Sequence, residues 1–156
     1  HFMIKNCQPF FVFFLIGLWI TQAQNFNMQD GSIETCSGNF YDSGGPSDTY
    51  NSNENLTFTI CPNDPFIERT VVTFSEFLTP GGTDVLTVYD GNDTTGPQLA
   101  QLTGEVVNPA DGDTPLELTA SDENTSGCLT FVFSSDKISE TEGWAATISH
   151  RKLFAF

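Results

Sequence analysis

The stretch that decides the fold class is Asp84-Val85-Leu86-Thr87-Val88-Tyr89-Asp90-Gly91. Leu86 and Val88 alternate with the residues between them, which is the period-two pattern of a strand that buries one face and exposes the other. Asp90-Gly91-Asn92-Asp93 then supplies residues that favour tight or left-handed turns. We therefore expect a half-buried strand that ends in a turn.

Other short segments of the chain show the same alternation, and no segment after residue 23 repeats with the helical period of 3.6. Between them lie turn-rich segments at residues 42–46, 80–82 and 109–113. About eight strands at this spacing predict an all-β, antiparallel sandwich. The alternating apolar residues outside the first stretch are Leu56, Phe58 and Ile60, then Val72 and Phe74, then Leu116 and Leu118, then Leu129, Phe131 and Phe133, and finally Trp144, Ala146 and Ile148.

The two ends of the chain differ from its body. A short basic start at Lys5 precedes an uncharged apolar run over residues 9–20, which is shorter than a membrane span needs and is followed by small residues up to Ala23. We expect residues 1–23 to be a signal peptide, the alternative being an uncleaved anchor, and residues 24–150 to form one domain. Residues 151–156 break the acidic composition and predict an atypical tail, such as a truncated or read-through end.

The charge balance excludes one class of partner. Twenty acidic residues stand against five basic ones, and residues 24–150 keep only Arg69 and Lys137, so their formal charge is 2 − 20 = −18. Such a field repels nucleic acid and anionic membranes, and we expect no membrane insertion once the signal is cleaved. The acidity favours either solubility outside the cell or the recruitment of divalent cations or basic partners.

Export places the cysteines in an oxidising compartment, where they are expected to pair. Cys36 opens a glycine-rich segment and Cys61 closes an apparent strand, so we predict the disulfide Cys36–Cys61, worth about 3 kcal/mol for a loop of that length. Cys128 is left without an obvious partner.

Histidine usage argues against most catalysis. The two histidines are His1, ahead of the signal, and His150, near the end of the last predicted strand. Nucleophilic triads need an imidazole beside the nucleophile, and zinc sites usually need one as a ligand. A carboxylate pair of the glycosidase type remains as chemistry, but nothing in the sequence selects one. We predict that the protein is not an enzyme.

Four segments in order resemble the CUB family. Residues 84–91 resemble its best-known signature, an Asp that opens a strand ending in Tyr-Asp-Gly, and residues 36–45 with Tyr50 and Cys61 resemble its first half, including the first disulfide. Phe133-Ser134-Ser135-Asp136 and Gly143-Trp144-Ala145-Ala146 resemble its closing segments. The resemblance covers residues 36–149, and the sequence of these segments is similar to that of modules in secreted Bacteroidetes proteins.

The resemblance implies a jelly-roll β-sandwich that binds proteins or glycans without catalysis. It also implies a calcium site at one end of the sandwich, formed by Tyr50, Asp84 and Asp136. The family's Glu falls on Pro80, although Glu76 or a carbonyl of residues 80–82 could substitute. The alternative is that Asp84 and Asp136 bind backbone amides at turn ends.

We therefore expect a secreted or cell-surface recognition or adhesion module whose partner is a protein or a carbohydrate. Two alternatives stay open at this point. One is a structural spacer within a larger surface protein, and the other is a small carboxylate-dependent glycoside hydrolase.

Overall fold

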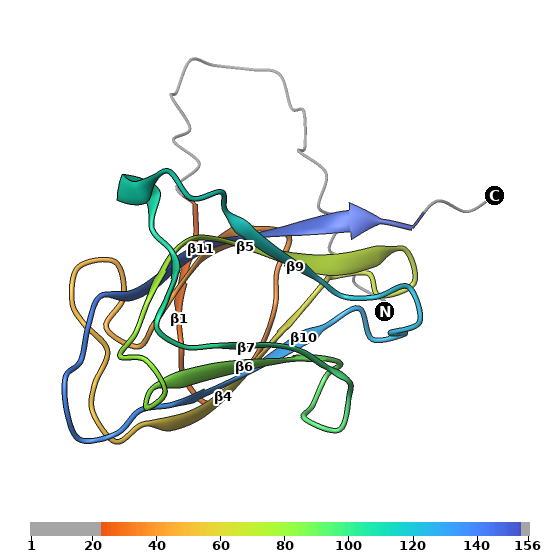
Figure 1. Cartoon of the computed structure of the whole chain (residues 1–156). Helices are drawn as coiled ribbons and strands as arrows, with labels where there is room; N and C mark the ends of the chain where they lie inside the picture. Colours follow the sequence, from red (N-terminus) through yellow and green to blue (C-terminus); the bar gives the residue numbers. More distant parts are fainter. Residues whose placement is uncertain (1–22, 154–156) are drawn as a thin grey trace, which may run out of the picture.

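The computed structural model describes residues 23–153, which form two β-sheets packed face to face (Figure 1). The expected signal peptide, apart from Ala23, lies outside the described residues. The six-stranded sheet has the order β1-β3-β11-β5-β8, with β9 also paired to β5, and the five-stranded sheet has the order β2-β4-β10-β6-β7. The strands of the six-stranded sheet are β1 (Asn25–Asn27), β3 (Gly38–Tyr41), β5 (Glu68–Leu78), β8 (Glu105–Val107), β9 (Leu116–Thr119) and β11 (Gly143–Lys152). Those of the five-stranded sheet are β2 (Gly31–Glu34), β4 (Asn55–Cys61), β6 (Val85–Asp90), β7 (Gln98–Leu102) and β10 (Leu129–Ser134).

The all-β sandwich is confirmed, but residues 23–153 hold eleven strands where the sequence predicts about eight. The additional strands are short and lie toward the sheet edges. In β2, for example, Ile33 is the single apolar residue, so no alternation marks it as a strand. Two edge pairings, β1 with β3 and β2 with β4, are parallel, whereas the other pairings are antiparallel. A one-turn 3₁₀ helix, η1 (Pro109–Asp111), follows β8.

The core forms where the inward faces of the two sheets meet. In β6, Leu86 and Val88 are fully buried while the residues between them are half-buried, as the alternation predicts. Trp144 of β11 stacks on Phe77 of β5, with ring centroids 5.9 Å apart, and meets Phe133 of β10 edge-on at 5.1 Å. Burial of such large aromatic side chains is the main source of stability in a sandwich of this size.

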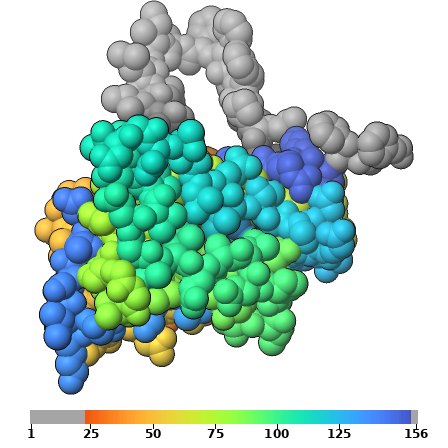
Figure 2. Space-filling view, in the orientation of Figure 1, coloured from red at the N-terminus to blue at the C-terminus, as the bar shows by residue number. Residues whose placement is uncertain are grey.

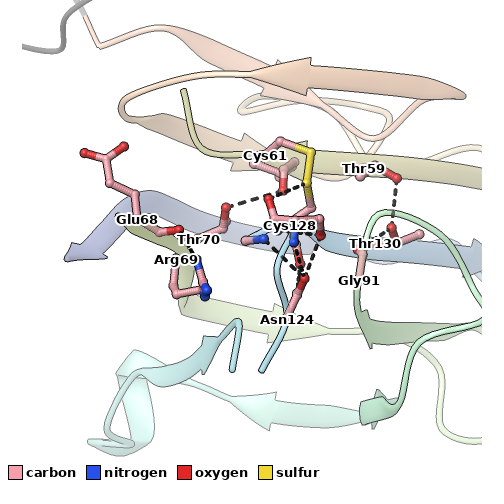
Figure 3. The surroundings of a disulfide bond; sticks show 12 residues. Thr59, Cys61, Glu68, Arg69, Thr70, Gly91, Asn124, Cys128 and Thr130 are labelled. Atoms are coloured by element: carbon pink, nitrogen blue, oxygen red, sulfur yellow. Dashed lines mark hydrogen bonds between the residues drawn. A yellow bond between two sulfur atoms is a disulfide. The ribbon is translucent and has the colours of Figure 1, made fainter. Parts of the chain in front are cut away.

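The predicted disulfide Cys36–Cys61 is wrong, because Cys61 pairs with Cys128 (Figure 3). The cause is strand register. Ile60 of β4 lies opposite Leu129 of β10, so the next pair along the two antiparallel strands is Cys61 and Cys128, whose Cα atoms are 4.1 Å apart. The bond joins two adjacent strands across 67 residues of sequence.

Strand β11 continues past His150, where the sequence analysis ends the domain. Arg151 lies opposite Arg69 and Lys152 opposite Glu68, so both residues pair with the start of β5. Within residues 23–153, no helix is long and apolar enough to cross a membrane.

Candidate functional site

Three loops meet at one end of the sandwich, on the left of Figure 1, and we call this the loop end. They are the β3–β4 loop (42–54), the β5–β6 loop (79–84) and the β10–β11 loop (135–142). The first and third loops lie side by side (Figure 2). The Asn53 amide of the first donates to the Asp136 carbonyl of the third at 2.7 Å. Tyr50, Asp84 and Asp136, the residues implied by the CUB resemblance, each come from a different one of these loops.

Asp84 joins the three loops through hydrogen bonds. Its side chain is only 1% exposed. Its Oδ2 accepts a 2.6 Å hydrogen bond from the Tyr50 hydroxyl, and its Oδ1 accepts one of 2.9 Å from the Asp136 amide. Its own carbonyl accepts a bond from the Thr79 hydroxyl at 3.1 Å. Both carboxylate oxygens therefore have partners within the protein, as burial of a charge requires.

The Tyr50 hydroxyl is fixed as a donor. The ring is buried against Phe133, with centroids 5.0 Å apart, and the hydroxyl lies 3.5 Å from that of Thr141. Burial, followed by the hydrogen bond to Asp84, raises the pKa of Tyr50 above its usual range. Thr141 in turn donates to the Leu78 carbonyl at 2.7 Å. This bond ties the end of β5 into the same network.

The arrangement does not fit a calcium ion. Calcium takes six to eight oxygen ligands, several of them anionic. Each carboxylate oxygen of Asp84 already accepts a hydrogen bond, and Asp136 uses its Oδ1 to accept from the Ile138 amide at 2.7 Å. Within residues 23–153, no group of three or more His, Cys, Asp or Glu side chains is close enough to hold a metal. Glu76, a candidate substitute, lies with Ala145 and Tyr41 around a surface hollow.

A second buried carboxylate, Asp42, lies at the same end and was missed by sequence reasoning. Its side chain has no exposed surface. Its Oδ1 accepts from the Gly44 amide at 2.7 Å and its Oδ2 from the Trp144 amide at 3.2 Å. Burial raises the pKa of Asp42 to about 6, although hydrogen bonds from these amides oppose the shift. The signal for this role is weak, because Asp-Ser-Gly-Gly indicates only a turn.

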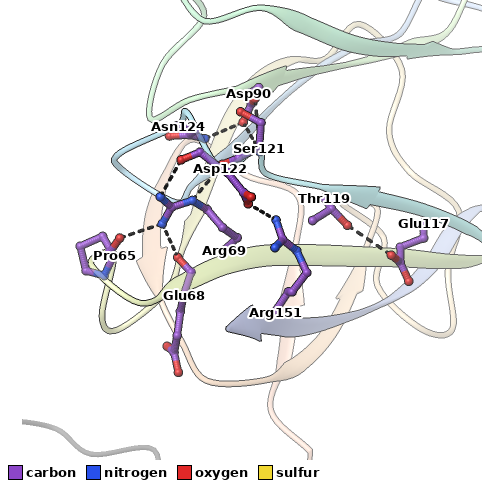
Figure 4. Close-up of polar contacts among 10 residues, drawn as sticks. All are labelled: Pro65, Glu68, Arg69, Asp90, Glu117, Thr119, Ser121, Asp122, Asn124 and Arg151. Atoms are coloured by element: carbon purple, nitrogen blue, oxygen red, sulfur yellow. Dashed lines mark hydrogen bonds and ion pairs between the residues drawn. The ribbon is translucent and has the colours of Figure 1, made fainter. Parts of the chain in front are cut away.

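The opposite end of the sandwich, which we call the disulfide end, has a different chemistry (Figure 4). Arg69 is only 4% exposed, and its guanidinium donates to four backbone carbonyls. Asp90 accepts from the Ser121 amide at 3.1 Å and from Asn124 Nδ2 at 2.6 Å. The four carbonyls bound by Arg69 belong to Pro65, Glu68, Ser121 and Asp122.

Comparisons with known proteins place this geometry in a fold class. No family model matches the chain, and no curated protein matches it. Among solved structures, the chain is similar to part of the full extracellular region of zebrafish Gpr126/Adgrg6, with a TM-score of 0.59 and 16% identity over 81% of this chain and 15% of that one. It is also similar to the MASP-1 CUB2 domain bound to Ca²⁺, with a TM-score of 0.54 and 15% identity over 78% of this chain and 98% of that one.

The third structure is the CUB1-EGF-CUB2 fragment of human MASP-1/3, with a TM-score of 0.55 and 15% identity over 83% of this chain and 45% of that one. The fold is therefore that of a CUB-like domain, and the resemblance read from the sequence is confirmed at this level. These structures do not bear on the resemblance to Bacteroidetes modules.

Proposed function

We propose that the protein is a non-catalytic extracellular recognition module whose loop end binds a protein or glycan partner. The observation that carries the proposal is the position of Asp84, which connects three loops from different parts of the chain. A rigid scaffold that presents loops with fixed relative positions is the usual architecture of a binding site. The CUB-like fold supports the same conclusion, because two of the similar structures are CUB domains.

An extracellular location is supported by two independent features. The disulfide Cys61–Cys128 belongs to an oxidising compartment. One similar structure is described as an extracellular region. A cleaved signal peptide over residues 1–23 is part of this proposal.

A more specific part of the proposal concerns whether the loop end needs calcium. One similar structure, the MASP-1 CUB2 domain, is described as bound to Ca²⁺. In the present chain an ion at the loop end would have to compete with the Tyr50 hydroxyl and the Asp136 amide for the oxygens of Asp84. We therefore propose that hydrogen bonds to Asp84 assemble the loop end and that binding does not require calcium.

The absence of catalysis is supported by the burial and the hydrogen bonds of three side chains that could otherwise act as acid or base. A glycosidase needs two carboxyl groups that face a substrate, whereas Asp42 and Asp84 are buried and accept hydrogen bonds from the protein. His150, on β11, lies with its Nδ1 2.9 Å from the Cys36 carbonyl oxygen, and burial lowers its pKa. None of these three side chains therefore has the surroundings of an activated catalytic group.

Binding can be tested with one substitution and a matched control. Ile138, in the β10–β11 loop, is 70% exposed, whereas Leu99, on the edge strand β7, is 38% exposed. The labelled, exported chain would be applied to a glycan array and to blotted cell-surface proteins of its source. We expect specific binding that Ile138→Asp removes and Leu99→Asp preserves. Equal effects of both variants, or no binding above background, would contradict the proposal and favour a spacer.

A further inference from the structure

The β10–β11 loop exposes a lysine, Lys137, at the tip of the loop end. Its neighbour Ile138 is 70% exposed, and Lys137 and Ser139 on either side of it are exposed as well. Figure 2 shows the loop in blue, projecting from the lower left of the molecule. The peptide bond between Lys137 and Ile138 is therefore accessible to another protein.

Few hydrogen bonds hold residues 137–140 in place. The Ile138 amide donates to Asp136 Oδ1 at 2.7 Å, and within the described part of the chain this is the single hydrogen bond that the four residues make. Ser139 has a φ of 69°, which is an unfavourable backbone conformation for a residue with a side chain. A segment with so few bonds opens locally at a small cost in free energy.

Both flanks of this segment are anchored to the sandwich. On one side, the Asp136 amide donates to Asp84 at 2.9 Å, and the Asp136 carbonyl accepts from the Asn53 amide at 2.7 Å. On the other side, the Thr141 hydroxyl donates to the Leu78 carbonyl at 2.7 Å. The segment between the anchors can therefore open while both sheets stay folded.

The other sites for a protease that cuts after basic residues are protected by strands. The described part of the chain contains three further lysine or arginine residues, Arg69, Arg151 and Lys152. Arg69 is only 4% exposed, and Arg151 and Lys152 both pair with β5 in the β11–β5 ladder. Cleavage after any of the three requires a strand to leave its sheet. Lys137 is thus the one basic residue of residues 23–153 that lies in an exposed loop.

We propose that the Lys137–Ile138 bond is a processing site for a secreted protease of the trypsin type, and that cleavage there switches off binding at the loop end. Such a protease carries a carboxylate in its specificity pocket, which selects a basic residue before the cut. One water molecule adds across the bond as its C–N linkage breaks, so Lys137 gains a carboxylate and Ile138 an amino group. The inference rests on the proposed function, to which it adds a means of regulation.

The fold explains why the cut would affect the loop and not the sandwich. Cys61 and Cys128, which form the disulfide, both precede the cut. The piece that follows it contains β11, which is held between β3 and β5. Ile138, by contrast, becomes the first residue of a chain end, and such ends are poorly ordered unless they are tied down. Ordering it again on binding costs conformational entropy, so affinity falls.

The cleavage site is tested by limited digestion of the exported chain with trypsin, followed by intact-mass measurement. We expect the first cut within residues 23–153 to follow Lys137. The two pieces should co-elute in gel filtration with an unchanged circular dichroism spectrum. Lys137→Gln should lose this cut. Lys152→Gln removes an equal charge from β11 and should be cut after Lys137 at the native rate.

The regulatory part is tested with the cut protein. Uncut and cut chains would be applied to the same glycan array and blotted cell-surface proteins that test the proposed function. We expect the cut chain to lose the binding that the uncut chain shows. Lys137→Gln that has been treated with trypsin should bind as it does without treatment, which controls for exposure to the protease.

Two results would overturn the inference. One is a Lys137–Ile138 bond that resists trypsin while a bond after Arg69 or Arg151 is cut, and the other is full binding by the cut chain. Absence of binding by the uncut chain would instead contradict the proposed function, and the masses of the pieces would still decide the cleavage site. The two failures are therefore distinguishable.

Discussion

The two ends of the sandwich are held together by different means. At the disulfide end, a covalent bond joins adjacent strands, and the buried Arg69 guanidinium gathers backbone carbonyls from two segments. At the loop end, two buried carboxylates, Asp84 and Asp42, hold the structure together by accepting hydrogen bonds from the β3–β4 loop, the β10–β11 loop and the start of β11. The comparison shows that the disulfide end is fixed by a covalent bond and a permanently charged guanidinium, while the loop end depends in part on Asp42, whose pKa is raised by burial to about 6.

The largest expected effect concerns the disulfide end. Replacing Cys61 and Cys128 together with alanine removes a cross-link that closes 67 residues of chain. In the chain-entropy model this lowers the free energy of unfolding by about 4 kcal/mol. Urea unfolding of the double variant and of the oxidised protein measures the difference. Equal stability would show that the bond does not constrain the unfolded chain.

The second effect concerns the loop end. Asp84→Ala leaves the buried Tyr50 hydroxyl and the Asp136 amide without an acceptor, which costs about 3 kcal/mol. Asp84→Asn retains one acceptor oxygen and serves as the milder control, with a smaller loss. Hydrogen exchange should show faster opening of the β10–β11 loop in the alanine variant. Unchanged exchange there would contradict the role assigned to Asp84.

A smaller effect is expected at Arg69. Lysine preserves the charge but has a single nitrogen, which cannot reach all four carbonyls that the guanidinium binds. Arg69→Lys should lower the free energy of unfolding by about 2 kcal/mol. Lys137→Arg, at an exposed position, is the control for interchanging lysine and arginine where no such hydrogen bonds are at stake. An unchanged free energy of unfolding in Arg69→Lys would mean that only the positive charge of Arg69 matters.

The last effect is a pH dependence carried by Asp42. Burial raises the pKa of Asp42 from its usual 3.8 to about 6, so between these values the folded state binds more protons than the unfolded state. The stabilisation from Asp42 is therefore complete below 3.8 and is lost as the pH rises through about 6. Unfolding measured from pH 4 to 7 should show the advantage of the native protein over Asp42→Asn declining as the pH rises. A constant difference would contradict this.

Sequence alone predicts the central part of the molecule better than its edges and cross-links. The alternation in residues 84–91 and 129–134 locates β6 and β10, because the alternating apolar residues of both strands face the core. The edge strand β2 carries no such pattern. The disulfide was predicted wrongly because pairing depends on which strands are neighbours, and a linear reading does not show that β10 lies beside β4.

The candidate site was predicted in part. The family resemblance identifies Tyr50 and Asp84, and the structure brings their side chains into contact. Asp136 takes part through its backbone amide, which a motif cannot distinguish from a carboxylate ligand. Asp42 escapes sequence reasoning because its burial arises from the close approach of Gly143, where a Cβ would lie 2.2 Å from the Asp42 carboxylate.

Thermal unfolding in millimolar calcium and again in chelator tests the central claim most directly, namely that hydrogen bonds to Asp84 assemble the loop end without an ion. An ion that binds the folded state would raise the unfolding midpoint by mass action. We predict the same midpoint in both solutions for the native protein and, at a lower temperature, for Asp84→Asn. A calcium-dependent rise in the native protein that Asp84→Asn abolishes would contradict the account.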